Sequence, residues 1–202
     1  PNTEIYNMWH TLSIHNALPI KEKLNIKNPR EEFIKIFEES TQTKKWKTKK
    51  EAYANLCKNL KIPETEENIK IIKDIRDKAE KKIKLFEYTE DLIQQLKKQG
   101  YEIGIASNST VFIIEEFKKS TNLLEKIDYP LFSFDIGVIK PDLKIFHKII
   151  ELSCYKPDEI VMIGDNYYDD VLPPKELGMY SIHLKDYDQL KKELALIGVF
   201  LD

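Results

Sequence analysis

The sequence is poor in the residues and patterns that mark several common classes of protein. Its two cysteines, Cys57 and Cys154, lie far apart without metal-ligand spacing, so neither a disulfide framework nor a zinc site is expected. No apolar run approaches the roughly 20 residues that span a bilayer, and no basic start followed by an apolar stretch marks a signal peptide. We therefore expect a cytoplasmic protein with no membrane partner.

An excess of charge of one sign is also lacking. The chain has 32 Lys and Arg against 34 Asp and Glu, a formal net charge of −2. A nucleic-acid-binding surface needs a basic excess, so no nucleic-acid partner is expected. With 202 residues, 42% of them hydrophobic, the chain is long enough for one domain with a substantial core, or for one domain that carries an insertion. Nothing in the sequence indicates the oligomeric state.

Residues 14–86 show helical patterning throughout. The segments 31–37 and 52–57 place apolar residues at i, i+3 and i+4 spacing, with charged residues between them. Prolines favour helix starts and stops, and they stand at the expected joins, namely Pro19, Pro29 and Pro63. No β-rich run interrupts this stretch, which predicts an all-helical unit.

From about residue 88 the pattern changes to short apolar strands that alternate with helices. Strands are expected at 101–107, 131–134, 160–163 and 180–184, and helices near 90–100, 110–121, 142–153 and before Gly178. Such alternation implies right-handed crossovers and a parallel sheet. The predicted fold is α/β, a doubly wound, Rossmann-like parallel sheet formed by residues 1–13 and 87–202. Residues 14–86 would be an all-helical cap inserted after the first strand.

Ligands of such sheets bind beyond the carboxyl ends of the strands, so the residues that follow each strand are of interest. The strand at 160–163 leads into Gly164 and Asp165, with Asp169 and Asp170 one turn later. Hard carboxylate oxygens at a strand end suit Mg²⁺. An aspartate-rich turn with helix N-caps would use the same residues, and this motif alone does not decide between the two interpretations.

Two further strand-end segments carry polar residues. Ser107 and Asn108 follow the strand at 101–107, where hydroxyls and backbone amides at a helix start can bind an anion. Lys140 precedes Pro141 and Asp142, and could neutralise a phosphate and a carboxylate together. Taken singly, each segment is also explained by ordinary helix capping or by a surface lysine.

The order of these three motifs on one α/β sheet closely resembles the haloacid dehalogenase (HAD) superfamily, whose second, third and fourth motifs they match. The helices between the first strand and Ser107 resemble the family's helical cap. In the family, the first strand ends in an aspartate nucleophile, followed two residues later by a second aspartate and then by Thr-Leu. In this sequence the nucleophile position is Asn7 and the second acid is Trp9, while Thr11 and Leu12 match.

The resemblance implies a Mg²⁺-dependent phosphatase that acts on a small phosphorylated metabolite. Asp165, the side chain at position 7 and the backbone carbonyl of Trp9 would hold the metal, and Asp170 would support it. Ser107, Asn108 and neighbouring amides would bind the phosphoryl group, Trp9 would contribute to substrate binding, and Lys140 would balance the negative charge. The implied catalytic set is thus Asn7, Ser107, Lys140 and Asp165.

Asn7 conflicts with this chemistry because an amide lacks the charge and nucleophilicity of a carboxylate. Loss of an attacking group commonly costs about 10³–10⁶ in rate. Trp9 also lacks the acid that protonates the leaving group, worth a further ~10²–10⁴. Three explanations remain: an engineered change in a competent enzyme, a natural protein that binds without turnover, or a first strand aligned incorrectly. The chain as given is therefore expected to be almost inactive.

Two other functions stay open. The chain could be a HAD-fold interaction protein that binds a partner without catalysis, for example through Trp46 and the lysines around it in 44–50. It could also be a metal-free dehalogenase, since an aromatic residue at position 9 resembles that branch, although the Gly164-Asp165 motif does not. Separately, Pro173 and Pro174 predict a late or kinked helix after Asp170.

Overall fold

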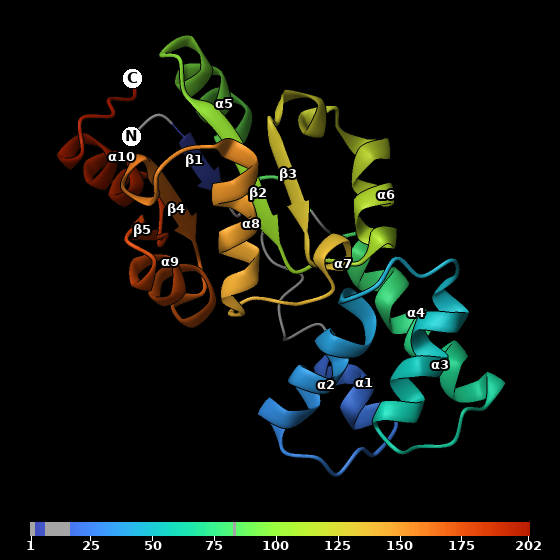
Figure 1. Cartoon of the computed structure of the whole chain (residues 1–202). Coiled ribbons are helices and arrows are strands. Elements are labelled where there is room, and N and C mark those ends of the chain that lie inside the picture. Colours follow the sequence, from blue (N-terminus) through green and yellow to red (C-terminus); the bar gives the residue numbers. More distant parts are fainter. Residues whose placement is uncertain (1–2, 7–16, 83) are drawn as a thin grey trace.

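The computed structural model describes residues 3–6, 17–82 and 84–202, and residues 3–6 by their backbone only. Five parallel strands form one sheet in the order β3-β2-β1-β4-β5. The strands are β1 (Thr3–Tyr6), β2 (Glu102–Ser107), β3 (Tyr129–Phe132), β4 (Ile160–Gly164) and β5 (Tyr180–His183). The predicted doubly wound α/β core with a helical cap is confirmed, and all five strands point towards the cap in Figure 1.

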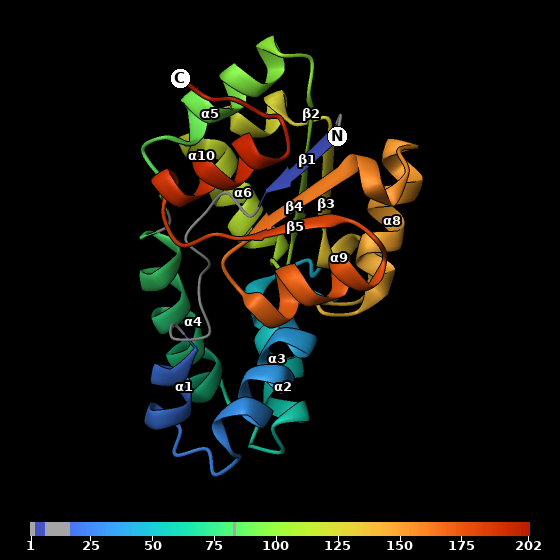
Figure 2. The same cartoon turned by 90° about the vertical axis from the view of Figure 1, so that its left-hand side faces the viewer.

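Helices cover both faces of the sheet (Figure 2). One face packs against α5 (Thr89–Lys98), α6 (Val111–Ser120) and α10 (Tyr187–Leu196), and the other against α8 (Leu143–Ser153) and α9 (Leu172–Glu176). β2 and β4 alternate their side chains between the two clusters: Ile103 and Ile105 face the first, whereas Ala106 faces the second. Three short helical turns complete this part, η2 (Leu123–Lys126), η3 (Pro157–Glu159) and η4 (Tyr167–Val171).

The cap consists of four helices below the carboxyl ends of the strands (Figure 1). They are α1 (Leu18–Lys23), α2 (Arg30–Gln42), α3 (Lys49–Asn59) and α4 (Glu66–Glu80). Pro19 lies in the first turn of α1 and Pro29 caps α2, as expected of prolines at helix starts. Side chains such as Phe33, Leu56 and Ile72 form a separate hydrophobic cluster, so the cap has a core of its own.

The prediction of a strand at 131–134 is wrong for residues 133 and 134. β3 ends at Phe132, and the chain turns into the short helix α7 (Ser133–Ile136). The reason is that Ser133 is anchored by contacts outside the strand. Its Oγ accepts a hydrogen bond from Ser109 N (3.0 Å) and donates one to the backbone oxygen of Gln42 (2.7 Å).

The segment after β4 has the kinked helix start that Pro173 and Pro174 predict. Residues Tyr167–Val171 form the π-helical turn η4, and the regular helix α9 begins only at Leu172. Both prolines then fall in the first turn of α9, where a missing backbone N–H costs no helical hydrogen bond. In the part of the chain that the structure describes, no helix is long and apolar enough to cross a membrane.

Candidate active site

The predicted motifs converge at one edge of the sheet. β2 ends at Ser107 and β4 ends at Gly164, and β1 lies between these two strands and pairs with both. The turn that carries Lys140 joins them through the contacts described below. Asn7 and Trp9 follow β1 in the sequence but lie outside the described residues.

Lys140 and Asp170 form a buried ion pair at this edge. Lys140 Nζ lies 2.5 Å from Asp170 Oδ1, and the two side chains are only 4% and 1% exposed. The other carboxylate oxygen, Oδ2, accepts a hydrogen bond from Asn166 N (3.1 Å). Since both oxygens are engaged, Asp170 holds the lysine ammonium in one position.

Gly164 makes room for this pair. A Cβ atom added at position 164 would lie 2.3 Å from the Cβ, Cγ and Oδ2 atoms of Asp170, a distance that real structures do not tolerate. The glycine at the end of β4 is therefore required by the close approach of the Asp170 side chain. This gives the Gly164-Asp165 motif a packing reason in addition to the chemistry expected of Asp165.

Asn108 ties the lysine turn to the end of β2. Its Oδ1 accepts a hydrogen bond from Lys140 N (2.7 Å), and its Nδ2 donates one to Lys140 O (3.2 Å). Next to it, Thr110 caps α6 by accepting a hydrogen bond from Ile113 N. This ten-residue helix thus starts just after the residue that holds the backbone of Lys140, and the backbone amides at a helix start suit an anion.

The turn after β4 places Asp165 at the surface and Asp169 partly buried. The backbone oxygen of Asp165 lies 3.0 Å from His183 Nε2, and the Asn166 amide group donates to Asp169 Oδ2 (2.6 Å). Burial raises the pKa of the Asp169 carboxyl to about 6; Lys140 opposes this rise and Asp170 adds to it.

A Mg²⁺ ion would have Asp165 as its exposed carboxylate donor at the strand end, which is the kind of ligand that this ion prefers. Asp170 already uses both oxygens in hydrogen bonds, so it fits a supporting position better than direct ligation. Among the side chains that the structure describes, no group of three or more His, Cys, Asp or Glu could hold a metal ion. The described residues thus supply part of the predicted ligand set, and the remainder falls on positions 7 and 9.

Sequence reasoning missed Glu38, which the cap contributes to this edge. A cleft of ≈ 800 Å³ lies between α2 and the core, and both Glu38 and Lys140 line it. Burial, and then the charge of Asp169, raise the pKa of Glu38 to about 7. No signal in the helical pattern of α2 distinguishes this glutamate from Glu31, Glu32 or Glu39, because the orientation of the cap decides which one is half-buried.

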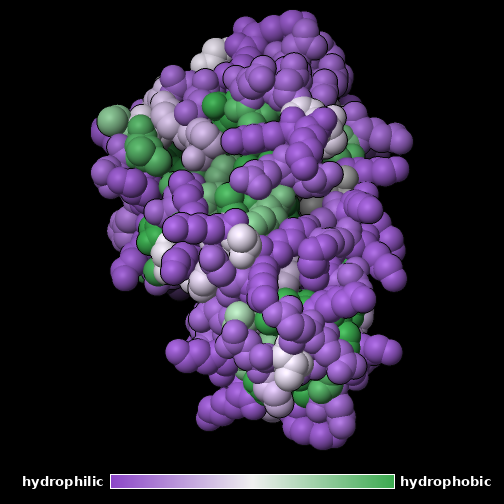
Figure 3. Space-filling view, turned by 90° about the vertical axis from the view of Figure 1, so that its right-hand side faces the viewer, coloured by the Kyte–Doolittle hydropathy of each residue, from purple (hydrophilic) through white to green (hydrophobic). Residues whose placement is uncertain are grey.

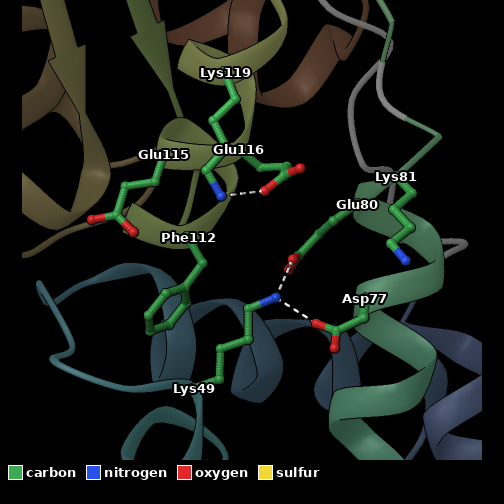
Figure 4. Close-up of a pocket in the computed structure, with 8 residues that line it drawn as sticks. All are labelled: Lys49, Asp77, Glu80, Lys81, Phe112, Glu115, Glu116 and Lys119. Carbon is green, nitrogen blue, oxygen red and sulfur yellow. Dashed lines mark hydrogen bonds and ion pairs between the residues drawn. The ribbon is translucent and has the colours of Figure 1, made fainter.

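The cap and the core also meet beside α6, next to a cluster of charged side chains of the cap. In Figure 4, Lys49 of α3 points between Asp77 and Glu80 of α4, with Nζ 2.5 Å from a carboxylate oxygen of each. Phe112 of α6 reaches from the core, with its ring 5.8 Å from Lys49 Nζ. In Figure 3, hydrophilic side chains cover most of this junction, while hydrophobic ones show mainly over the core. These two ion pairs lie within the cap, between α3 and α4, whereas Phe112 reaches across from the core and packs against the hydrophobic cluster of the cap.

The lysine-rich segment around Trp46 is partly structural. Trp46 packs against the hydrophobic cluster of the cap, and Lys44 Nζ lies 4.6 Å from its ring centroid. Lys45 forms an ion pair with Asp135 of α7 (2.5 Å). With Lys49 and Lys50, which pair with carboxylates of the cap, four lysines of the segment 44–50 have partners within the chain.

Parts of curated proteins resemble this chain. Pyrophosphatase PpaX of Bacillus mycoides is 35% identical over 86 residues, which cover 43% of this chain and 40% of that protein. Pyrophosphatase PpaX of Bacillus thuringiensis is 32% identical over 95 residues, covering 47% and 44%. The chain thus spans less than half the length of these relatives.

Solved structures share the fold over nearly the whole chain. A HAD phosphatase from Thermococcus onnurineus has a TM-score of 0.59 at 18% identity and covers 99% of both chains. A HAD family enzyme from Bacteroides thetaiotaomicron has a TM-score of 0.67 at 19% identity, covering 94% of this chain and 97% of that one. A family model for haloacid dehalogenase-like hydrolases matches residues 20–183. The chain belongs to the haloacid dehalogenase-like hydrolase family.

Proposed function

We propose that the site binds the phosphoryl group of a small phosphorylated metabolite, as the site of a phosphatase-type HAD hydrolase. The observation that carries this proposal is the fixed cation at the carboxyl edge of the sheet. Lys140 is buried, paired with Asp170, tied to β2 through Asn108 and open to a cleft beneath the cap. A phosphoryl group there would meet Lys140 and the amides at the start of α6.

Each described residue has a role in this proposal. Ser107 and Asn108 bind the phosphoryl oxygens, Lys140 offsets their charge, and Asp170 keeps Lys140 in place. Asp165, with positions 7 and 9, would hold Mg²⁺, which supplies Lewis-acid stabilisation of phosphoryl oxygens when bound. Magnesium occupies the related enzyme from Bacteroides thetaiotaomicron in one structure, which shares the fold with a TM-score of 0.66, 18% identity and coverage of 94% and 96%. We assign residues 1–13 and 87–202 to the core and 14–86 to the cap.

Asn7 sets the expected activity of the chain. An aspartate at this position would attack phosphorus, break the ester P–O bond so that the alcohol leaves, and form an aspartyl-phosphate that water then hydrolyses to phosphate. Asparagine lacks the negative charge for that attack, so turnover should be about 10³–10⁶ lower than with aspartate. The chain as given is then a phosphate-ester-binding protein, and the Asn7→Asp variant is the enzyme.

The test is hydrolysis of p-nitrophenyl phosphate by the chain and by its Asn7→Asp variant, with and without Mg²⁺. The proposal expects turnover only in the variant and only with Mg²⁺. A matched Asn7→Asp/Lys140→Met protein should lose that turnover. If Asn7→Asp folds and binds Mg²⁺ but hydrolyses nothing, the chain is a binding or interaction protein rather than a phosphatase with an altered nucleophile.

A further inference from the structure

The cleft beside Lys140 is asymmetric. Its core side consists of residues 137–142 and the turn after β4, and its cap side is one face of α2. Since Lys140 lines the cleft, a phosphate bound at the proposed site would leave the rest of its ester in this space. The volume of ≈ 800 Å³ is ample for a small alcohol part. The side chains around that part therefore decide which esters fit.

The lining of this space is acidic. The described lining side chains include five carboxylates and two lysines, a difference of −3; the carboxylates are Glu31, Glu38, Glu39, Asp142 and Asp169, and the lysines are Lys35 and Lys140. Lys35 lies 3.9 Å from Glu39, and Lys140 is engaged by Asp170. Among the described lining residues, therefore, both cations already have carboxylate partners.

Glu38 is the cap carboxylate that interacts with the charged groups of the core across the cleft. It is half-buried, and it feels the charges of both Asp169 and Lys140 across the cleft. A second anionic group on a ligand would have to come close to Glu38 and Asp169 in a partly desolvated space, where like charges repel more strongly than in water. A hydroxyl group, in contrast, can donate a hydrogen bond to either carboxylate.

Resting on the function proposed above, we propose that Glu38 is a specificity-determining residue that selects phosphate monoesters with an uncharged, hydroxyl-bearing alcohol part. Esters that carry a second anion, either a carboxylate or another phosphate, are disfavoured. Pyrophosphate, to which the names of the matched relatives refer, is therefore expected to bind poorly to this chain. The selection comes from the cap, whereas the phosphate is held by the core.

Glycerol 3-phosphate and 3-phosphoglycerate form a matched pair of probes, because they are similar in size and differ mainly by one carboxylate. Their dissociation constants are measured by calorimetry on the chain as it is, with Mg²⁺ present, so that no turnover is needed, and at pH 8, above the pKa of about 7 of Glu38, so that its carboxylate is charged. We expect glycerol 3-phosphate to bind about tenfold more tightly, from Coulomb repulsion across a few ångströms of partly desolvated space. In Glu38→Gln the preference should fall to within about twofold, mainly through tighter binding of 3-phosphoglycerate.

Glu32→Gln is the control, since it makes the same change in charge at an exposed position of the same helix that is not in the described lining of the cleft. It should leave the preference within about twofold of the parent. An unchanged preference in Glu38→Gln, an equal change in both variants, or no binding of either probe overturns the proposal. Binding selectivity without hydrolysis by Asn7→Asp would instead refute the phosphatase function and leave the role of Glu38 standing.

Discussion

The two sides of the cleft are built differently. On the core side, Lys140, Asp170 and Asn108 are buried or half-buried, and each is fixed by hydrogen bonds or an ion pair. On the cap side, Glu38 faces the like charge of Asp169 across the cleft. The core is thus organised before a ligand arrives, whereas the cap presents a carboxylate to which a ligand hydroxyl could donate a hydrogen bond. The core side therefore suits chemistry that is common to many substrates, and the cap side suits selection among those substrates.

The largest expected effect is on the core side. Lys140→Met leaves the Asp170 carboxylate buried without its partner, which should cost about 3–5 kcal/mol of unfolding free energy. Urea unfolding measures this cost. The Lys140→Met/Asp170→Asn double variant should regain much of the loss, because the isolated charge is then removed. A cost below about 1 kcal/mol in the single variant would mean that water reaches Asp170 freely.

The next prediction tests how tightly Gly164 packs against Asp170, the partner of Lys140. Gly164→Ala places a methyl group 2.3 Å from Asp170 atoms, so either the side chain or the strand must shift. Overpacking of this kind typically costs about 1–3 kcal/mol, and phosphate binding should weaken because Lys140 follows Asp170. Urea unfolding and phosphate calorimetry measure both. Unchanged stability together with unchanged binding would show that Asp170 has room to move and does not position the lysine.

The positions of many core-side residues could be predicted from the sequence, because they depend on local strand and turn patterns. Ser107, Lys140 and Asp165 directly follow or border strand and turn patterns that hydrophobicity reveals, and the parallel sheet brings the strand ends together. The cap side was not readable. Whether Glu38 or Glu39 becomes half-buried depends on how the cap is docked, and Ser133 leaves the strand because of a contact with Gln42 far along the chain. Such docking depends on contacts between side chains far apart in the sequence, which local sequence patterns do not reveal.

A third prediction compares the buried core pair with the ion pairs that join α3 and α4 within the cap. Lys49→Met removes the cation between Asp77 and Glu80, but Arg76 remains 3.9 Å from Glu80, so the expected cost is about 1–2 kcal/mol. Lys50→Met is the matched control. Lys50 is exposed and pairs with an exposed partner, Glu66, so its loss should cost at most about 0.5 kcal/mol. Equal costs in urea unfolding would mean that the ion pairs of Lys49 contribute no more than an exposed surface pair.

The smallest expected effect is a gain in unfolding free energy rather than a loss, and it comes from replacing Glu38. Its pKa is about 7 in the folded chain, against 4.5 for an unperturbed glutamate. Between these two values the folded state binds more protons than the unfolded state, so the contribution of Glu38 to stability falls as pH rises through this window and is constant above it. Glu38→Gln cannot ionise and escapes this loss. Solvent screening of the half-buried group reduces the expected gain, so the variant should gain about 1 kcal/mol on the parent between pH 5 and pH 8.

Urea unfolding of both proteins at pH 5 and pH 8, in buffer with a chelator, measures that gain. Glu31→Gln, exposed on the same helix, should show no such change with pH relative to the parent. If Glu38→Gln also follows the parent at both pH values, Glu38 ionises without cost in the folded chain. The cap would then present an ordinary solvated carboxylate to the cleft. The two sides of the cleft would no longer differ in whether their charged groups are stabilised in the folded chain.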